Sequence, residues 1–77
     1  MRFREYENNA ATLKEWSKQL NVANKGIYQL YPTVENTLNH WKDELNKNIG
    51  TNTFSIYSTP EMTIHNWQQK LNNLYNI

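Results

Sequence analysis

Few residues of this chain are of the types that carry out catalysis or bind metals. The 77-residue sequence has no cysteine, and its two histidines, His40 and His65, stand outside any cluster with metal-ligand spacing. His40 and Glu44 are four residues apart, a spacing that on a helix indicates a surface pair. Glycine occurs only at positions 26 and 50, which excludes a glycine-rich phosphate loop. With no Ser-His-Asp set and no paired-carboxylate pocket, we expect no enzyme activity, no metal and no cofactor.

The length predicts a single domain over residues 1–77 that must bury a small core efficiently. A chain of this size buries only about 60% of the surface of its unfolded form. We therefore expect the three Trp, five Tyr and two Phe to supply most of the buried apolar area. The sequence has no apolar run of about 18 residues and no signal-peptide pattern, so we expect no membrane association. The absence of cysteine fits a reducing compartment, and we expect a cytoplasmic protein. We expect no linker, internal repeat or block of like charge.

The spacing of apolar residues predicts a mainly α, small domain of four to five helices. Thr12 and Glu15 form a capping box, and Pro32 must end a helix because it restricts the residue before it. Ser58 or Thr59 followed by Pro60 is a typical helix start. The expected helices span residues 2–8, 12–20, 22–31, 33–47 and 60–75.

Residues 53–57 alternate polar and apolar side chains and are rich in β-branched and aromatic types, which predicts a short strand. Because an isolated strand is not stable, this segment either pairs with another chain or is merely extended. The last two helices carry narrow apolar stripes that suit pairing with another helix, within the chain or across a two-fold axis. The residues expected to anchor a core or a dimer interface are Trp41, Ile64, Trp67 and Leu71.

Residues 12–30 carry the most specific pattern in the chain. Two closely crossing helices need a small residue midway along the first, which Ser17 supplies, and a turn residue that tolerates positive φ, which Asn21 supplies. The apolar positions that complete the pattern are Val22, Ile27 and Leu30. On these residues the segment resembles the helix-turn-helix of the phage repressor and Cro superfamily.

The resemblance implies that helix 23–30 lies in the major groove of double-stranded DNA. Asn and Gln side chains can bind adenine through two hydrogen bonds, and Lys can reach guanine. The residues expected to contact bases are Asn24, Lys25, Tyr28 and Gln29. The residues expected to contact phosphates are Arg2, Arg4, Lys14 and Lys18. The implied function is sequence-specific transcription regulation by a small repressor of the phage or plasmid type, acting as a homodimer.

A second hypothesis belongs to a different class of protein. The net charge of only +1 is small for a DNA-binding protein, since phosphate neutralisation supplies most non-specific affinity. The chain is then a protein-binding inhibitor or adaptor of the phage or plasmid type that uses a helical scaffold and the surface of residues 53–75. An exposed strand over Phe54 to Tyr57 can add to the sheet edge of a partner. The two hypotheses differ in which surface matters, residues 23–29 or residues 53–75.

Overall fold

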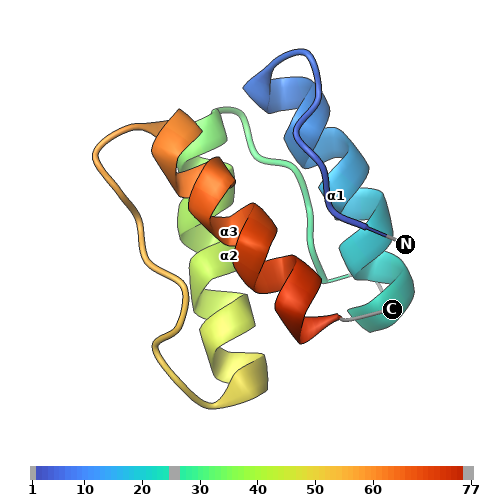
Figure 1. The fold of residues 1–77 in the computed structure, drawn as a ribbon, viewed down its shortest axis with the longest axis vertical. Helices are drawn as coiled ribbons and strands as arrows, with labels where there is room; N and C mark the ends of the chain where they lie inside the picture. Colours follow the sequence, from blue (N-terminus) through green and yellow to red (C-terminus); the bar gives the residue numbers. More distant parts are fainter. Residues whose placement is uncertain (1, 25–26, 76–77) are drawn as a thin grey trace.

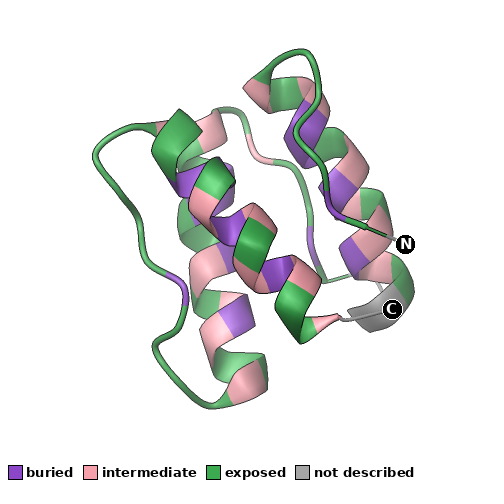
Figure 2. Ribbon diagram, in the orientation of Figure 1, coloured by how far each residue is buried: buried purple, intermediate pink, exposed green. Residues whose placement is uncertain are grey.

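The fold is an all-helical domain in which three helices run in the same direction and extended segments connect them (Figure 1). The structure, a computed structural model, describes residues 2–24 and 27–75. Within these ranges the helices are α1 (Asn9–Asn24), α2 (Val34–Ile49) and α3 (Pro60–Leu74), and no strand is present. The domain measures 24 × 24 × 21 Å, and one hydrophobic core lies between the three helices. The buried residues line the inner faces of the helices (Figure 2).

The chain contains a threefold internal repeat, so the expectation of no repeat was wrong. We define unit 1 as residues 3–21, unit 2 as residues 28–46 and unit 3 as residues 54–72. Each unit is an extended segment followed by one helix, and the same residue types recur at equivalent positions. The equivalent sets are Phe3, Tyr28 and Phe54; Tyr6, Tyr31 and Tyr57; Thr12, Thr37 and Thr63; Trp16, Trp41 and Trp67; Leu20, Leu45 and Leu71; and Asn21, Asn46 and Asn72.

Each helix begins at a polar residue whose side chain caps it. Asn8, Thr33 and Thr59 each accept a hydrogen bond from the backbone amide three residues further on, at 2.8, 3.0 and 3.1 Å. These bonds satisfy amide groups that the first turn of a helix leaves without an internal partner. At the other end of α2, Gly50 has φ 75° and donates its amide to the carbonyl of Asn46, as is typical of a left-handed helix cap.

The three tryptophans form the centre of the core, each at most 1% exposed. Every indole packs edge-on against the aromatic ring that opens its own unit, an arrangement that aromatic quadrupoles favour. The pairs are Phe3–Trp16 at 5.8 Å, Tyr28–Trp41 at 5.8 Å and Phe54–Trp67 at 5.3 Å between ring centroids. The indole NH of each donates to a backbone carbonyl of its own extended segment, namely that of Arg4, Gln29 or Ser55, at 2.8–2.9 Å.

A buried threonine fastens each extended segment to the start of its helix. In all three units the threonine hydroxyl accepts from the backbone amide of the unit's tyrosine, at 2.8, 3.0 and 2.9 Å. The same hydroxyl donates to the carbonyl of the capping residue, at 2.9, 3.0 and 3.1 Å. Because each buried hydroxyl both donates and accepts a hydrogen bond, its burial leaves no polar atom without a partner.

An asparagine at the end of each unit binds the backbone of the next unit. The side chain of Asn21 donates to the carbonyl of Tyr28 at 2.8 Å and accepts from its amide at 2.7 Å. Asn46 holds Phe54 in the same way, at 2.9 and 2.8 Å. Asn72 holds Phe3 at 3.0 and 2.7 Å, although these residues are 69 apart in sequence. This last pair, which we name the closing contact, joins unit 3 to unit 1 and completes a ring.

The repeat explains which predicted elements are wrong. Residues 2–8 are not helical: residues 2–6 are extended and residues 7–8 form a bend before α1, because unit 1 begins with a segment equivalent to those of the other units. The predicted helix over 22–31 is absent: residues 22–24 continue α1, and residues 27–31 are extended. The predicted helix 12–20 lies within α1, but α1 begins at Asn9 and is capped by Asn8, so the predicted capping box of Thr12 and Glu15 is wrong. Asn21 lies inside α1 rather than ending a helix, and its side chain holds the backbone of Tyr28.

The predicted strand at 53–57 is an extended segment without a strand partner in the described chain. The backbone of Phe54 is bound by the side chain of Asn46, so no neighbouring strand is needed to satisfy it. The expected helices 33–47 and 60–75 correspond to α2 and α3, whose starts and apolar faces were predicted correctly. The structure thus has three helices in the described residues rather than four to five.

Candidate functional site

The structure does not assemble the helix-turn-helix over residues 12–30, because its second helix is missing. Val22, expected to be buried beneath the turn, is 77% exposed. Ile27 and Leu30, expected to pack against the first helix, are exposed as well. Ser17 does not mark a close crossing of two helices; its hydroxyl donates to the carbonyl of Tyr28 at 2.8 Å.

The predicted base-contacting residues do not share an exposed helical face. Tyr28 is 0% exposed, packs edge-on on the tryptophan of its unit, and accepts a hydrogen bond from Asn48 at 3.0 Å. Burial raises the pKa of Tyr28 from its ordinary value of 10.0 to about 12. Its side chain is therefore not available to DNA in this fold. Gln29 is exposed on the extended segment, whereas the side chain of Asn24 and the whole of Lys25 lie outside the described residues.

The predicted phosphate-contacting residues all lie at the surface. These residues are Arg2, Arg4, Lys14 and Lys18. Among the described residues only Lys18 of this set is in an ion pair, with Glu15 at 3.4 Å. The side chain of Gln19 donates to the carbonyl of Arg2 at 3.0 Å, which holds the start of unit 1 against α1.

The predicted anchors of a core or dimer interface lie in the core of this one chain. Trp41, Ile64, Trp67 and Leu71 are each at most 1% exposed. Their apolar surface is already covered within the core of this chain, so these side chains offer no surface to a second copy.

The histidines and carboxylates form no metal centre in the part of the chain that the structure describes. His40 stacks on the ring of Tyr31, with centroids 4.0 Å apart and planes 8° from parallel. His65 lies across the closing contact from Glu5, with Nδ1 2.9 Å from the carboxylate. None of the described helices is long and apolar enough to cross a membrane.

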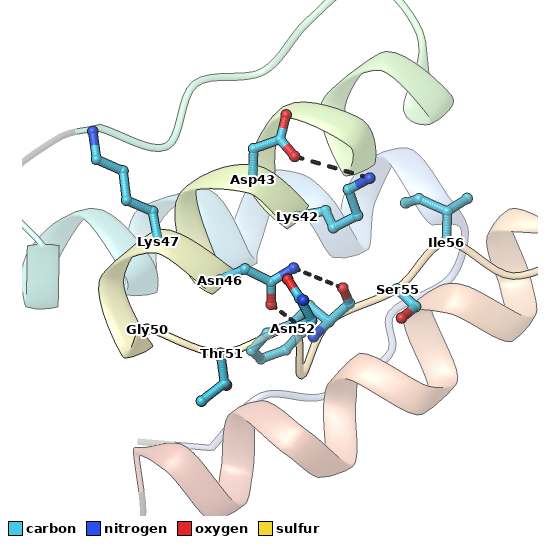
Figure 3. Close-up of a pocket in the computed structure, with 10 residues that line it drawn as sticks. Lys42, Asp43, Asn46, Lys47, Gly50, Thr51, Asn52, Ser55 and Ile56 are labelled. Atoms are coloured by element: carbon cyan, nitrogen blue, oxygen red, sulfur yellow. Dashed lines mark hydrogen bonds and ion pairs between the residues drawn. The ribbon is translucent and has the colours of Figure 1, made fainter.

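A groove of about 680 Å³ lies between α2 and the extended segment of unit 3 (Figure 3). We name it the α2 groove. It is lined by Lys42, Asp43, Asn46 and Lys47 of α2, by Gly50, Thr51 and Asn52 of the connection, and by Phe54, Ser55 and Ile56 of unit 3. Asn46 crosses its floor to hold Phe54, so the groove is built on one of the three repeated asparagine contacts.

The backbone of Ile56 faces this groove without a partner among the described residues. Phe54 directs both backbone groups to α2, while the carbonyl of Ser55 and the amide of Tyr57 bind side chains of α3. In an extended chain the backbone groups of residues two apart point to the same edge. The amide and carbonyl of Ile56 therefore point to the α2 side, as those of Phe54 do. They are free to bind another extended chain.

Exposed apolar side chains continue the surface around Ile56. Ile56, Tyr57 and Met62 are all classed among the exposed large apolar residues of the domain. The hydroxyl of Tyr57 donates to the side chain of Asn66 on α3 at 3.1 Å, and Ser58 contacts the sulfur of Met62. The segment after Phe54 is thus held against α3 while its outer side remains open.

The lysines of the α2 groove were not among the site residues predicted from the sequence. Lys42 of unit 2 is equivalent to Ser17 of unit 1, and Lys47, directly after unit 2, is equivalent to Val22, directly after unit 1. The same positions are Gln68 and Asn73 in the region of unit 3. Only a comparison of the units with one another reveals the difference, because no local motif surrounds these lysines.

No protein-family model matches the chain, and no curated protein or solved structure matches it.

Proposed function

We propose that the domain is a protein-binding module without a catalytic role, and that its partner docks at the extended segment of residues 53–57. The observation that carries the proposal is the unpartnered backbone of Ile56, which faces the α2 groove. An extended segment with a free amide and carbonyl can take up a further extended chain by backbone hydrogen bonds. The exposed apolar side chains of Ile56, Tyr57 and Met62 offer the partner side-chain contacts beside that edge.

The internal repeat supplies a matched control for this proposal. Leu30 in unit 2 is equivalent to Ile56, is also exposed, and has no backbone partner in the described residues. Ile56→Asp and Leu30→Asp place the same charge at equivalent exposed positions, so both variants are expected to fold. Only the first alters the proposed docking surface.

The test is selection of phage-displayed random peptides on the immobilised 77-residue chain, followed by titration of the selected peptides. We expect the selected peptides to lose binding to the Ile56→Asp variant and to keep it with Leu30→Asp. Equal affinity for both variants would remove Ile56 from the proposed site. Failure to select any peptide that depends on Ile56 would refute the protein-binding proposal itself.

We propose duplex DNA as a second candidate ligand, because four cationic side chains are exposed on residues 2–18. Residues 1–30 carry five basic and three acidic side chains, against three and four in residues 31–77. In this proposal Arg2, Arg4, Lys14 and Lys18 hold phosphates, and the exposed Gln29 contacts bases from an extended segment in place of a major-groove helix. Transcription regulation by a phage- or plasmid-type repressor, acting as a cytoplasmic homodimer, belongs to this second proposal.

Selection from a randomised duplex pool at low salt tests the DNA proposal. Enrichment of an inverted repeat with half-sites about one helical turn apart is expected of a dimeric DNA-binding protein. Changing Arg2, Arg4, Lys14 and Lys18 to glutamine should abolish binding. Changing Lys42 and Lys47 to glutamine should not. Four phosphate contacts give a slope of log affinity against log salt of at most about 4 per protomer. No enrichment by the folded protein would refute this proposal.

A further inference from the structure

The three units share a framework, and they differ most in the charges placed beside it. The tryptophan, threonine and asparagine positions are identical in all three units. By contrast, the helix positions four residues before and one residue after the repeated asparagine carry Lys42 and Lys47 in α2, and Gln68 and Asn73 in α3. Identical positions maintain the ring, since each makes the same hydrogen bonds in every unit. Ser17, the unit 1 equivalent of Lys42, still donates to the carbonyl of Tyr28 in the next unit. Among the described residues Lys42 and Lys47 make no such bond, so these two side chains can be adapted to a ligand.

The surroundings of the α2 groove are cationic. Lys42 lies 3.9 Å from Asp43, whose side chain is largely exposed, so this ion pair is loose and screened by solvent. Lys47, in the last turn of α2, forms no ion pair with any described residue. Lys70 of α3 donates to the carbonyl of Thr53 from the opposite side of the segment. The groove lining therefore carries two lysines and one carboxylate, and Lys70 holds the segment that precedes Ile56 from the side of α3.

The equivalent groove along α3 has an acidic residue at the position where the α2 groove has the apolar Ile56. That groove is lined by Arg2, His65, Gln68, Gln69, Asn72 and Asn73, and its volume is about 530 Å³. The residue equivalent to Ile56 is Glu5, whose carboxylate already binds His65. A carboxylate next to the free backbone groups would repel an acidic chain there. The α2 groove has an apolar residue at this point and lysines on its helix wall.

We infer that the α2 groove binds an acidic peptide segment in extended conformation, with one backbone amide and carbonyl paired to Ile56 and its carboxylates directed to Lys42 and Lys47. This inference rests on the proposed protein-binding function and names the chemistry of its partner. Charge complementarity selects the acidic side chains, and the free backbone groups of Ile56 select the extended conformation. The volume of the groove accommodates a short peptide segment rather than a folded domain.

The test uses the full chain and a fluorescein-labelled hexapeptide of alternating valine and glutamate. Binding is followed by fluorescence anisotropy up to about 1 mM peptide, and by the NMR shift of the Ile56 amide. We expect the acidic peptide to bind and its lysine-for-glutamate counterpart not to bind. Raising the salt concentration from about 0.05 to 0.5 M should weaken binding, because exposed charges are screened.

Three variants of α2 separate charge from structure, because they act in opposite directions. Lys42→Gln combined with Lys47→Gln should weaken binding by about three- to tenfold, the range expected for two exposed ion pairs. Asp43→Asn should strengthen binding by about two- to threefold, since it removes the only carboxylate that lines the groove. The matched control, Gln68→Ala with Asn73→Ala on α3, should leave the affinity unchanged.

The backbone contact is tested on the peptide rather than on the protein. N-methylation of the central valine removes one amide donor without changing the charge, and it should abolish the shift at Ile56. If the acidic peptide binds no better than the lysine peptide, or if Asp43→Asn weakens binding, the acidic specificity is refuted. If display-selected peptides depend on Ile56 but carry no acidic residues, this inference fails while the proposed function stands. If no peptide depends on Ile56, both fail.

Discussion

The closing contact should contribute as much to stability as the two other asparagine contacts. Asn72 makes two hydrogen bonds to the backbone of Phe3, and their lengths differ from those of Asn21 and Asn46 by at most 0.2 Å. Removing two partly buried hydrogen bonds costs about 2 kcal/mol of unfolding free energy. Alanine has a better helix propensity than asparagine by roughly 0.6 kcal/mol, which offsets part of the loss. We therefore expect Asn72→Ala to destabilise the domain by about 1.5 kcal/mol.

The assay is thermal unfolding followed by circular dichroism and tryptophan fluorescence. For a domain of this size, a loss of about 1.5 kcal/mol lowers Tm by roughly 6–12 °C. Asn21→Ala and Asn46→Ala should give decreases in the same range. Asn39→Ala is the control: the side chain of this exposed asparagine of α2 forms no hydrogen bond with a described residue, so the change should leave Tm equal or slightly higher.

Unequal decreases in Tm among Asn21→Ala, Asn46→Ala and Asn72→Ala would contradict an equal role for the three contacts. If Asn72→Ala lowered Tm by less than about 2 °C while the other two variants lowered it by the expected amount, the ring would not be closed in solution. A decrease for Asn39→Ala equal to the others would show that the loss has nothing to do with the backbone of the next unit.

Three further predictions follow from single features of the fold. A circular permutant can join Ile77 to Met1 through a short linker and open the chain between Gly50 and Thr51. We expect it to fold with a Tm within about 8 °C of the parent, because the closing contact already brings unit 3 to unit 1. An unfolded permutant in circular dichroism would contradict the ring. Gly50→Ala should destabilise by about 1 kcal/mol in chemical denaturation, since the residue has φ 75°, and an unchanged midpoint would contradict a left-handed cap. Because burial raises the pKa of Tyr28 to about 12 in the folded state, its contribution to stability is fully present below pH 10 and falls as pH rises through about 12. Tyr28→Phe should remove that alkaline loss when Tm is followed against pH, and an identical pH profile for both proteins would contradict it.

The sequence was sufficient to predict the elements whose signals are local. α2 and α3 were located because their apolar residues recur at helical spacing and because Thr33 and Pro60 mark their starts. The tryptophans Trp41 and Trp67 were recognised as anchors, and the structure buries both. These predictions depend on contacts within a helix or across one helix face.

The elements that were predicted wrongly depend on side chains that bind a distant backbone. Asn21 has the local signature of a helix end, yet it lies within α1 and binds Tyr28 with both ends of its amide. No propensity scale contains that information, because the partner lies outside the helix. The repeat itself was present in the sequence at Trp16, Trp41 and Trp67, but it becomes visible only when the chain is compared with itself over whole units rather than over single turns.

The closing contact also has a consequence for folding kinetics. The caps, the threonine and indole bonds, and the bonds of Asn21 and Asn46 to the next unit join residues 3 to 12 positions apart, whereas the closing contact joins residues 69 apart. Local contacts form quickly, while a long loop must lose more entropy before its contact forms. The units should therefore assemble in chain order around neighbouring asparagines, and the bonds between Asn72 and Phe3 should form last. In the native protein the same bonds should open first, so the amide of Phe3 should exchange its hydrogen faster than the equivalent amide of Phe54.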